Sequence, residues 1–127
     1  MRRLALVALL VREYDEAIVF FTETLGFGLI EDTPLGGGKR WVVAAPEQGA
    51  GLVLAKAASP EQAARVGDQT GGRVGFFLHT GDFDRDHARM EAAGVRFVEG
   101  PRVEPYGKVG VFLDLYGNRW DLIEPRA

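Results

Sequence analysis

The apolar and polar positions divide the chain into short blocks, each with the period of a strand or a helix. Leu4–Val11 is continuously apolar over eight residues, which predicts a strand covered on both faces. From Glu16 to Leu25 the apolar residues recur at helical spacing, with Asp15 as the expected cap and Gly26 as the stop. Three more strands are then expected, at residues 28–33, 39–45 and 51–56. The glycine-rich segment 34–38 between the first two predicts either a mobile lid over a pocket or a plain flexible hairpin.

The same order of elements is predicted a second time. Residues 57–72 are small and polar, which indicates a linker with one short helix that begins near Pro60. A strand at 73–80, a helix at 83–93 with Asp82 as its cap, and a strand at 95–99 are expected to follow it.

The segment from Gly107 to Pro125 predicts a β-hairpin that completes the second half. Its first strand alternates apolar residues on two faces, and Tyr116, Gly117 and Asn118 have the chemistry of a turn. The closing strand places Asp121 among apolar neighbours. Because a buried carboxylate needs a partner, we expect an Arg or Tyr beside it.

These elements form an internal repeat of strand, helix and three strands. Sliding the halves together aligns residues 13–15 with residues 82–84. The sequence therefore predicts an α+β fold in a single domain, residues 1–127. Its two βαβββ modules are expected at residues 4–56 and 73–124, joined by the linker at residues 57–72.

Composition narrows the class of protein. The chain has 127 residues, 46% of them hydrophobic, and a net charge of −3, which argues against a nucleic-acid-binding protein. It has no Cys, so disulfides, thiolate metal sites and a thiol nucleophile are excluded. The longest apolar run is too short to span a membrane and no signal peptide is evident. We expect a cytoplasmic protein with no membrane partner.

Two motifs carry a family resemblance. The phrase D-L-Y-G-N-R-W-D-L-I-E at 114–124 and the phrase R-E-Y-D-E-A-I-V-F-F-T-E-T-L-G-F at 12–27 resemble the closing and opening signatures of the vicinal oxygen chelate superfamily. This superfamily includes glyoxalase I, bleomycin-resistance proteins and extradiol dioxygenases. The resemblance implies a curved mixed sheet around a cup with the helices outside, and a homodimer.

The resemblance also implies where the metal ligands of the family would lie in this chain. Metal-dependent members carry His, Gln or Glu ligands on facing strands, and the Glu of the closing signature is Asp121 here. The other ligand positions fall on Leu6 and on Gly75, or on Arg73 in a shifted register, and segment 51–54 contains no acid. We therefore expect no metal and no other cofactor.

Strand alternation and side-chain chemistry select the candidate site residues. Asp121 and His79 are the candidate catalytic groups, although His79 also fits an exposed strand end without a role. The candidate ligand-binding residues, whose aromatic members equally fit core packing, are Leu6, Trp41, Phe77, Phe112, Tyr106 and Arg73. Cations that flank the strands would suit an anionic or carbonyl-bearing ligand, and they are Lys39, Arg40, Arg73, Lys108 and Arg119.

Three functions remain open at this point. The first is a small-molecule-binding protein without a metal, similar to the bleomycin-resistance branch. The second is a metal-dependent lyase, isomerase or dioxygenase with a displaced divalent-metal site built from Asp121 with His79 or Glu104. The third is a structural or regulatory module whose cup is filled by its own side chains. The sequence identifies neither a ligand nor a pathway.

Overall fold

The computed structural model describes residues 1–127 and divides them into two compact units. Unit 1 spans Met1–Gly67 and unit 2 spans Asp68–Ala127, so the boundary falls inside the segment predicted as the linker. Each unit holds a four-stranded mixed sheet with the same pattern of strand order, β1-β4-β3-β2 in unit 1 and β5-β8-β7-β6 in unit 2. The predicted α+β class with tandem βαβββ modules is confirmed. The strands form two hydrogen-bonded sheets, where one curved sheet was expected.

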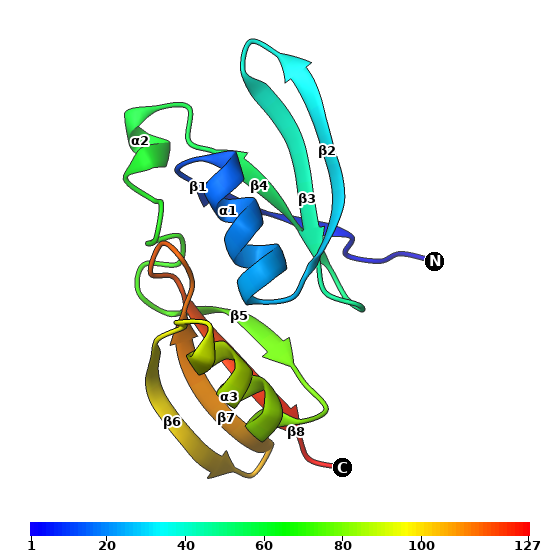
Figure 1. Cartoon of the computed structure of the whole chain (residues 1–127), viewed down its shortest axis with the longest axis vertical. Helices are drawn as coiled ribbons and strands as arrows, with labels where there is room; N and C mark the ends of the chain where they lie inside the picture. The colour runs from blue at the N-terminus through cyan, green and yellow to red at the C-terminus, as the bar shows by residue number, and fades with distance from the viewer. The chain divides into compact units, whose positions relative to one another are not determined.

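Unit 1 contains four strands and three helical segments (Figure 1). Its first strand runs parallel to the fourth, and the other neighbours are antiparallel. In chain order the elements are β1 (Leu6–Val11), α1 (Tyr14–Val19), the π-helix η1 (Phe20–Thr24), β2 (Gly28–Gly36), β3 (Lys39–Ala45), β4 (Gly51–Lys56) and α2 (Pro60–Ala63).

Unit 2 repeats this plan with one helix (Figure 1). Its first strand is again parallel to its last, which is paired on its other side with an antiparallel neighbour. The elements are β5 (Val74–His79), α3 (Phe83–Ala92), β6 (Phe97–Glu104), β7 (Gly107–Leu113) and β8 (Arg119–Pro125). The sixth strand is longer than the predicted 95–99.

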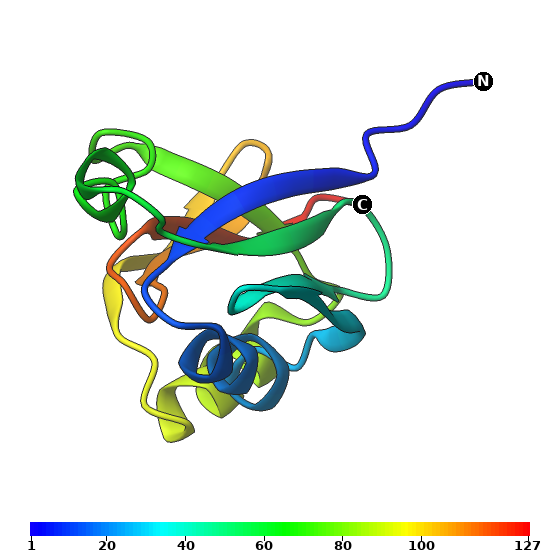
Figure 2. The same cartoon turned by 90° about the horizontal axis from the view of Figure 1, so that it is seen from above.

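The core of unit 1 lies between its sheet and α1, which covers one side of the sheet (Figure 2). Leu9, Val11 and Phe21 are fully buried there. The expectation of a strand covered on both faces is wrong for the start of β1, because Leu6 and Val7 are exposed. Only the second half of this strand faces the helix core.

The first helix begins earlier than predicted. It starts at Tyr14 after the cap position Glu13, and Asp15 lies within its first turn instead of capping it. The Asp15 side chain pairs with the Arg40 guanidinium at 2.8 Å. The expected stop is present, because Gly26 adopts a positive φ of 77° that favours glycine.

The glycine-rich segment forms a hairpin between β2 and β3, which agrees with the second of its two predicted alternatives. Pro34, Leu35 and Gly36 form the end of β2, and the turn is confined to Gly37 and Gly38. The chain thus continues its strand pairing through most of the segment expected to be loop.

Both later helices begin with a side-chain cap, and the cap of α3 is the predicted Asp82. Ser59 accepts a hydrogen bond from the Gln62 N–H at the start of α2, and Asp82 accepts one from the Arg85 N–H at the start of α3. None of the helices has the length and apolar character needed to cross a membrane.

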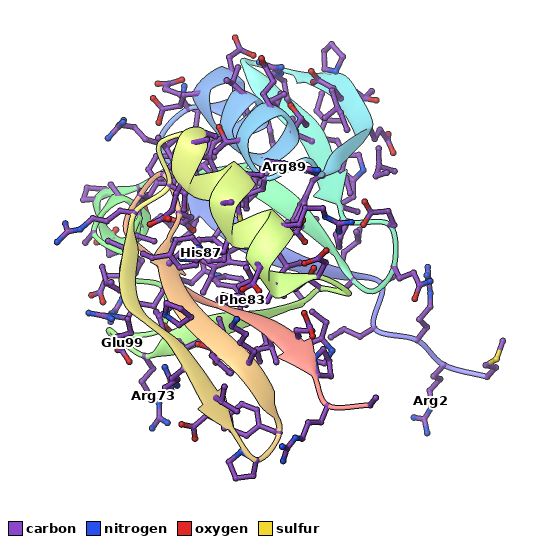
Figure 3. All side chains as sticks on the ribbon, turned by 60° about the horizontal axis from the view of Figure 1, so that its bottom comes forward. Arg2, Arg73, Phe83, His87, Arg89 and Glu99 are labelled. Atoms are coloured by element: carbon purple, nitrogen blue, oxygen red, sulfur yellow. The ribbon has the colours of Figure 1, made fainter.

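The core of unit 2 is a set of stacked rings under α3. His87 stacks on Phe83 with ring centroids 5.4 Å apart and contacts Phe97 at 4.3 Å. Figure 3 shows Phe83 and His87 on the side of α3 that faces the sheet. His87 is half-buried in this stack, and Phe112 continues the ring contacts toward Trp120.

Candidate functional site

The candidate site lies on the face of the unit 2 sheet opposite α3. The helix side is fixed by Glu124, whose Oε1 accepts a hydrogen bond from the Phe83 N–H at 2.8 Å. Successive residues of a strand point to opposite faces, so Asp121 and Ile123 point away from the helix. We call this surface the Asp121 face.

Strand register shows which residues share the Asp121 face. Asp121 pairs with Phe77 on one side and with Val111 on the other, and Val111 pairs with Glu99. Residues that are paired across a sheet lie on the same face. The next row of the face, reached by the same pairings, is His79, Ile123, Val109 and Arg102.

Asp121 is a buried acid with an unused acceptor. Its residue is 7% exposed, and its Oδ1 is buried without a hydrogen-bond partner. Burial raises the pKa of its carboxyl, the positive charge of Arg102 opposes this rise, and the negative charge of Glu99 adds to it. The expected Arg partner therefore exists as a nearby charge, but no hydrogen bond reaches Oδ1.

Arg102 forms ion pairs with two acids of its own strand, β6. Its guanidinium lies 3.6 Å from Glu99 and 3.3 Å from Glu104, and Arg119 lies 3.6 Å from Glu99. Burial disfavours the charged form of Arg102, yet Tyr106 and the two acids raise its pKa overall. Its Nη1 is buried and, like Asp121 Oδ1, has no hydrogen-bond partner.

In a second buried acid of unit 2, Asp114, both carboxylate oxygens accept hydrogen bonds. Asp114 is 5% exposed and accepts hydrogen bonds from the N–H groups of Tyr116 and Asn118, the Asn118 amide and the Trp120 indole, at 2.9–3.0 Å. These bonds order the turn between β7 and β8. This network was not predicted, although the D-x-x-x-N spacing across the turn glycine is a signal of it.

The predicted site residues of unit 2 fall into exposed and buried sets. Phe77 is 62% exposed beside Asp121, and Tyr106 is 52% exposed in the turn after β6. His79 is exposed at the end of β5, and Arg73 is exposed just before that strand. Phe112 differs from these, because it is 0% exposed and packs on the helix side of the sheet.

The predicted residues of unit 1 share a corresponding face. Leu6 and Trp41 lie on the side of their sheet opposite α1, as the pairing of Ala8 with Val53 and Val43 shows. Val53 occupies the place in β4 that Asp121 occupies in β8. This face of unit 1 therefore has an apolar residue at the position where unit 2 has its buried acid.

The residues present do not fit a divalent-metal centre. No group of three or more His, Cys, Asp or Glu side chains is placed to hold an ion. Asp121, His79 and Glu104 do not form such a group, and Glu104 is engaged by Arg102. The expectation that no metal is used stays a prediction.

Two of the cations expected to edge a cup lie elsewhere. Arg40 lies 5.1 Å from the Tyr14 ring centroid and bonds to Asp15 and Asp32 on the helix side of unit 1. The corresponding contacts in unit 2 are made by Lys108, Phe83 and Asp84. Acids on the helix side thus neutralise Arg40 and Lys108, which leaves Lys39, Arg73 and Arg119 of the five cations named as support for an anionic ligand.

Tandem βαβββ units with this strand order define a class of small α+β proteins, and the sequence identifies the family within it. The chain belongs to the Glyoxalase/Bleomycin resistance protein/Dioxygenase superfamily, whose model matches residues 3–122.

Several individual proteins resemble the chain over nearly its whole length. An uncharacterized protein of Shewanella frigidimarina (strain NCIMB 400) is 51% identical over 93% of this chain and 90% of its own. The crystal structure of TnmS3, an antibiotic binding protein from Streptomyces sp. CB03234, matches with 32% identity and a TM-score of 0.80, covering 99% of this chain and 98% of TnmS3. UcmS2 matches with 34% identity and a TM-score of 0.83, covering 98% of this chain and 99% of UcmS2.

Proposed function

We propose that the protein binds a small organic molecule on the Asp121 face and acts by holding it, without a catalytic metal. The observation that carries this proposal is the buried, unpartnered Oδ1 of Asp121 directly beside the exposed ring of Phe77. The similarity to TnmS3, named as an antibiotic binding protein, supports the same class of function.

The chemistry of the face suits a ligand with an apolar body and few polar groups. Binding sites for small molecules combine apolar and aromatic walls with a few placed polar groups that fix orientation. Phe77 and Tyr106 supply exposed rings, and Asp121 supplies an acceptor that costs free energy while it has no partner.

The side chains that could act as metal ligands favour this proposal over metal-dependent catalysis. A lyase or dioxygenase of the superfamily would need a divalent ion held by several side chains, and no such group is formed. Homodimer formation and a cytoplasmic location remain predictions.

A ligand screen with thermal unfolding tests the proposal. Aromatic compounds, including antibiotics, are added to the purified protein with a chelator present, and compounds that raise Tm are confirmed by calorimetry. A compound present at a hundred times its Kd adds about 2.7 kcal/mol to stability. We expect hits that bind equally well with the chelator and with added Ni²⁺, Zn²⁺ or Mn²⁺.

A matched pair of variants localises the binding. Phe77→Ala removes an exposed ring from the Asp121 face and is expected to weaken binding by about tenfold. Leu115→Ala removes an exposed apolar side chain from the turn after β7 and is expected to leave the Kd unchanged. Binding that requires a metal, or an equal loss in both variants, would contradict the proposal.

A further inference from the structure

The charged residues on the strands of the Asp121 face do not balance. The strands of this face carry three carboxylates and two guanidinium groups, which leaves a formal excess of one negative charge. The carboxylates are Glu99, Glu104 and Asp121, and the guanidinium groups are Arg102 and Arg119. His79, at the far end of β5, is counted as neutral at pH 7.

The excess charge falls on Asp121. Glu99 lies within ion-pair distance of both Arg102 and Arg119, and Glu104 lies within ion-pair distance of Arg102. Asp121 makes no ion pair with either cation, although Arg102 lowers its pKa from a distance. A buried carboxylate in this state is stabilised by any group that brings a positive charge and an N–H donor.

The aromatic neighbour fits the same chemistry. Phe77 is the direct cross-strand partner of Asp121 and is largely exposed. An aromatic ring face attracts a cation and also packs against an apolar ligand body. A ring and a carboxylate side by side on a sheet are suited to an organic ammonium group.

From these observations we propose that the ligand of this face carries a protonated amine, which donates to Asp121 Oδ1 while the apolar body of the ligand packs on Phe77. This inference rests on the proposed small-molecule binding and specifies the class of ligand. It replaces the anionic or carbonyl-bearing ligand that the flanking cations suggested.

Because the Oδ1 of Asp121 is buried, a ligand reaches it only when neighbouring side chains move. Arg102 and Arg119 are partly exposed, and their contacts to Glu99 at 3.6 Å are too long for hydrogen bonds. Exposed ion pairs of this length are weak, so the Arg119 side chain moves at little cost, whereas Arg102 also contacts Glu104 at 3.3 Å and has a buried Nη1. The proposal requires these side chains to move while the strand pairing beneath them stays in place.

Two matched fluorescent probes test the proposal. Dansylcadaverine has an aromatic body and a primary amine that is protonated at pH 7.5, and its N-acetyl derivative has the same body without the charge. Binding is followed by dansyl fluorescence. We expect dansylcadaverine to bind the unmodified protein at least about tenfold tighter than the acetylated probe.

Two variants that each remove one negative charge show whether Asp121 causes the preference for the amine probe. Asp121→Asn is expected to abolish the preference for the amine. Asp84→Asn also removes one acid from unit 2, but on the helix side where it pairs with Lys108, and should retain the preference. A preference that persists in Asp121→Asn would overturn the assignment to Asp121.

The comparison of the two probes does not depend on any variant. Equal binding of both probes to the unmodified protein would overturn amine recognition and leave small-molecule binding in place. Binding of neither probe at concentrations up to about 1 mM, an affinity limit near 4 kcal/mol, would count against both proposals.

Discussion

Two buried aspartates of unit 2 are in opposite hydrogen-bonding states. Asp114 accepts four hydrogen bonds that order the turn between β7 and β8. Asp121 lies seven residues further along, equally shielded from water, with a buried oxygen that accepts none. An unsatisfied buried polar group costs about 1–3 kcal/mol, so the two acids affect stability with opposite signs.

Substitution of each aspartate by asparagine tests this difference. Asp121→Asn removes an uncompensated charge and is expected to stabilise the protein by about 1 kcal/mol at pH 7. Asp114→Asn replaces one acceptor oxygen by an N–H donor facing other donors, and is expected to destabilise it by about 2 kcal/mol. Urea unfolding of both variants measures the changes, and a loss of stability in Asp121→Asn would contradict the account of this residue.

The stability gained in Asp121→Asn should depend on pH. The pKa of Asp121 in the folded protein is raised above its ordinary value of 3.8, so the ionised carboxylate destabilises the fold at neutral pH. As pH falls through the raised pKa, the folded protein takes up a proton before the unfolded chain does. The advantage of the variant should therefore shrink on acidification toward the ordinary value.

Other groups on the same face also titrate or carry charge. Their contribution to the pH dependence of stability cancels when Asp121→Asn is compared with the unmodified protein. These groups are Glu99, Glu104 and Arg102 on β6, His79 on β5, and Arg119 on β8 itself. They are present in both proteins, so the difference between the unmodified protein and Asp121→Asn isolates the one carboxyl. An advantage that grows as pH falls would contradict the raised pKa.

At the scale of the element, β6 determines the composition of the Asp121 face. Glu99 and Arg102 are three residues apart, so simple alternation places them on opposite faces. The register shift between Glu99 and Arg102 brings both to the same face, opposite Val111 and Val109. Gly100 lies in this irregular segment with φ +85°, and a Cβ there would lie 2.7 Å from the Val109 carbonyl oxygen.

Replacement of Gly100 tests this irregular strand. Gly100→Ala is expected to destabilise the protein by about 3 kcal/mol, because it combines a strained φ with a backbone clash. Gly94→Ala is the matched control, since Gly94 has φ +93° but no atom within 4 Å of an added Cβ, and about 1 kcal/mol is expected. Equal losses by chemical denaturation would show that the close approach to β7 is unimportant.

Local sequence signals predict the regular elements well and the irregular ones poorly. Alternation places Phe77, His79 and Asp121 on one face, as the register shows, and the caps Ser59 and Asp82 follow from their positions before helical segments. Arg102 was missed because the predicted strand ended at residue 99, whereas β6 continues through a register shift to Glu104. The π-helix after α1 and the extension of β2 into the glycine-rich segment likewise depend on packing beyond the local pattern.

At the scale of the whole molecule, the two units repeat a plan but differ in chemistry. Both place a cation over the aromatic ring at the start of a helix, and both pair the last strand with the first. The position of Asp121 is occupied by Val53 in unit 1, so a single unit supplies the buried acid. This asymmetry was visible in the sequence, whereas the charge balance around Asp121 required the structure.

The most direct test of the account is an amide chemical-shift titration of the isotope-labelled protein with the screening compound that raises Tm most. We predict saturable shifts concentrated in β5, β6 and β8 around Phe77, Arg102 and Asp121, with the exposed side of α3 unchanged and the same result in the presence of a chelator. Shifts confined to residues away from the Asp121 face, or shifts that appear only after a divalent metal is added, would contradict it.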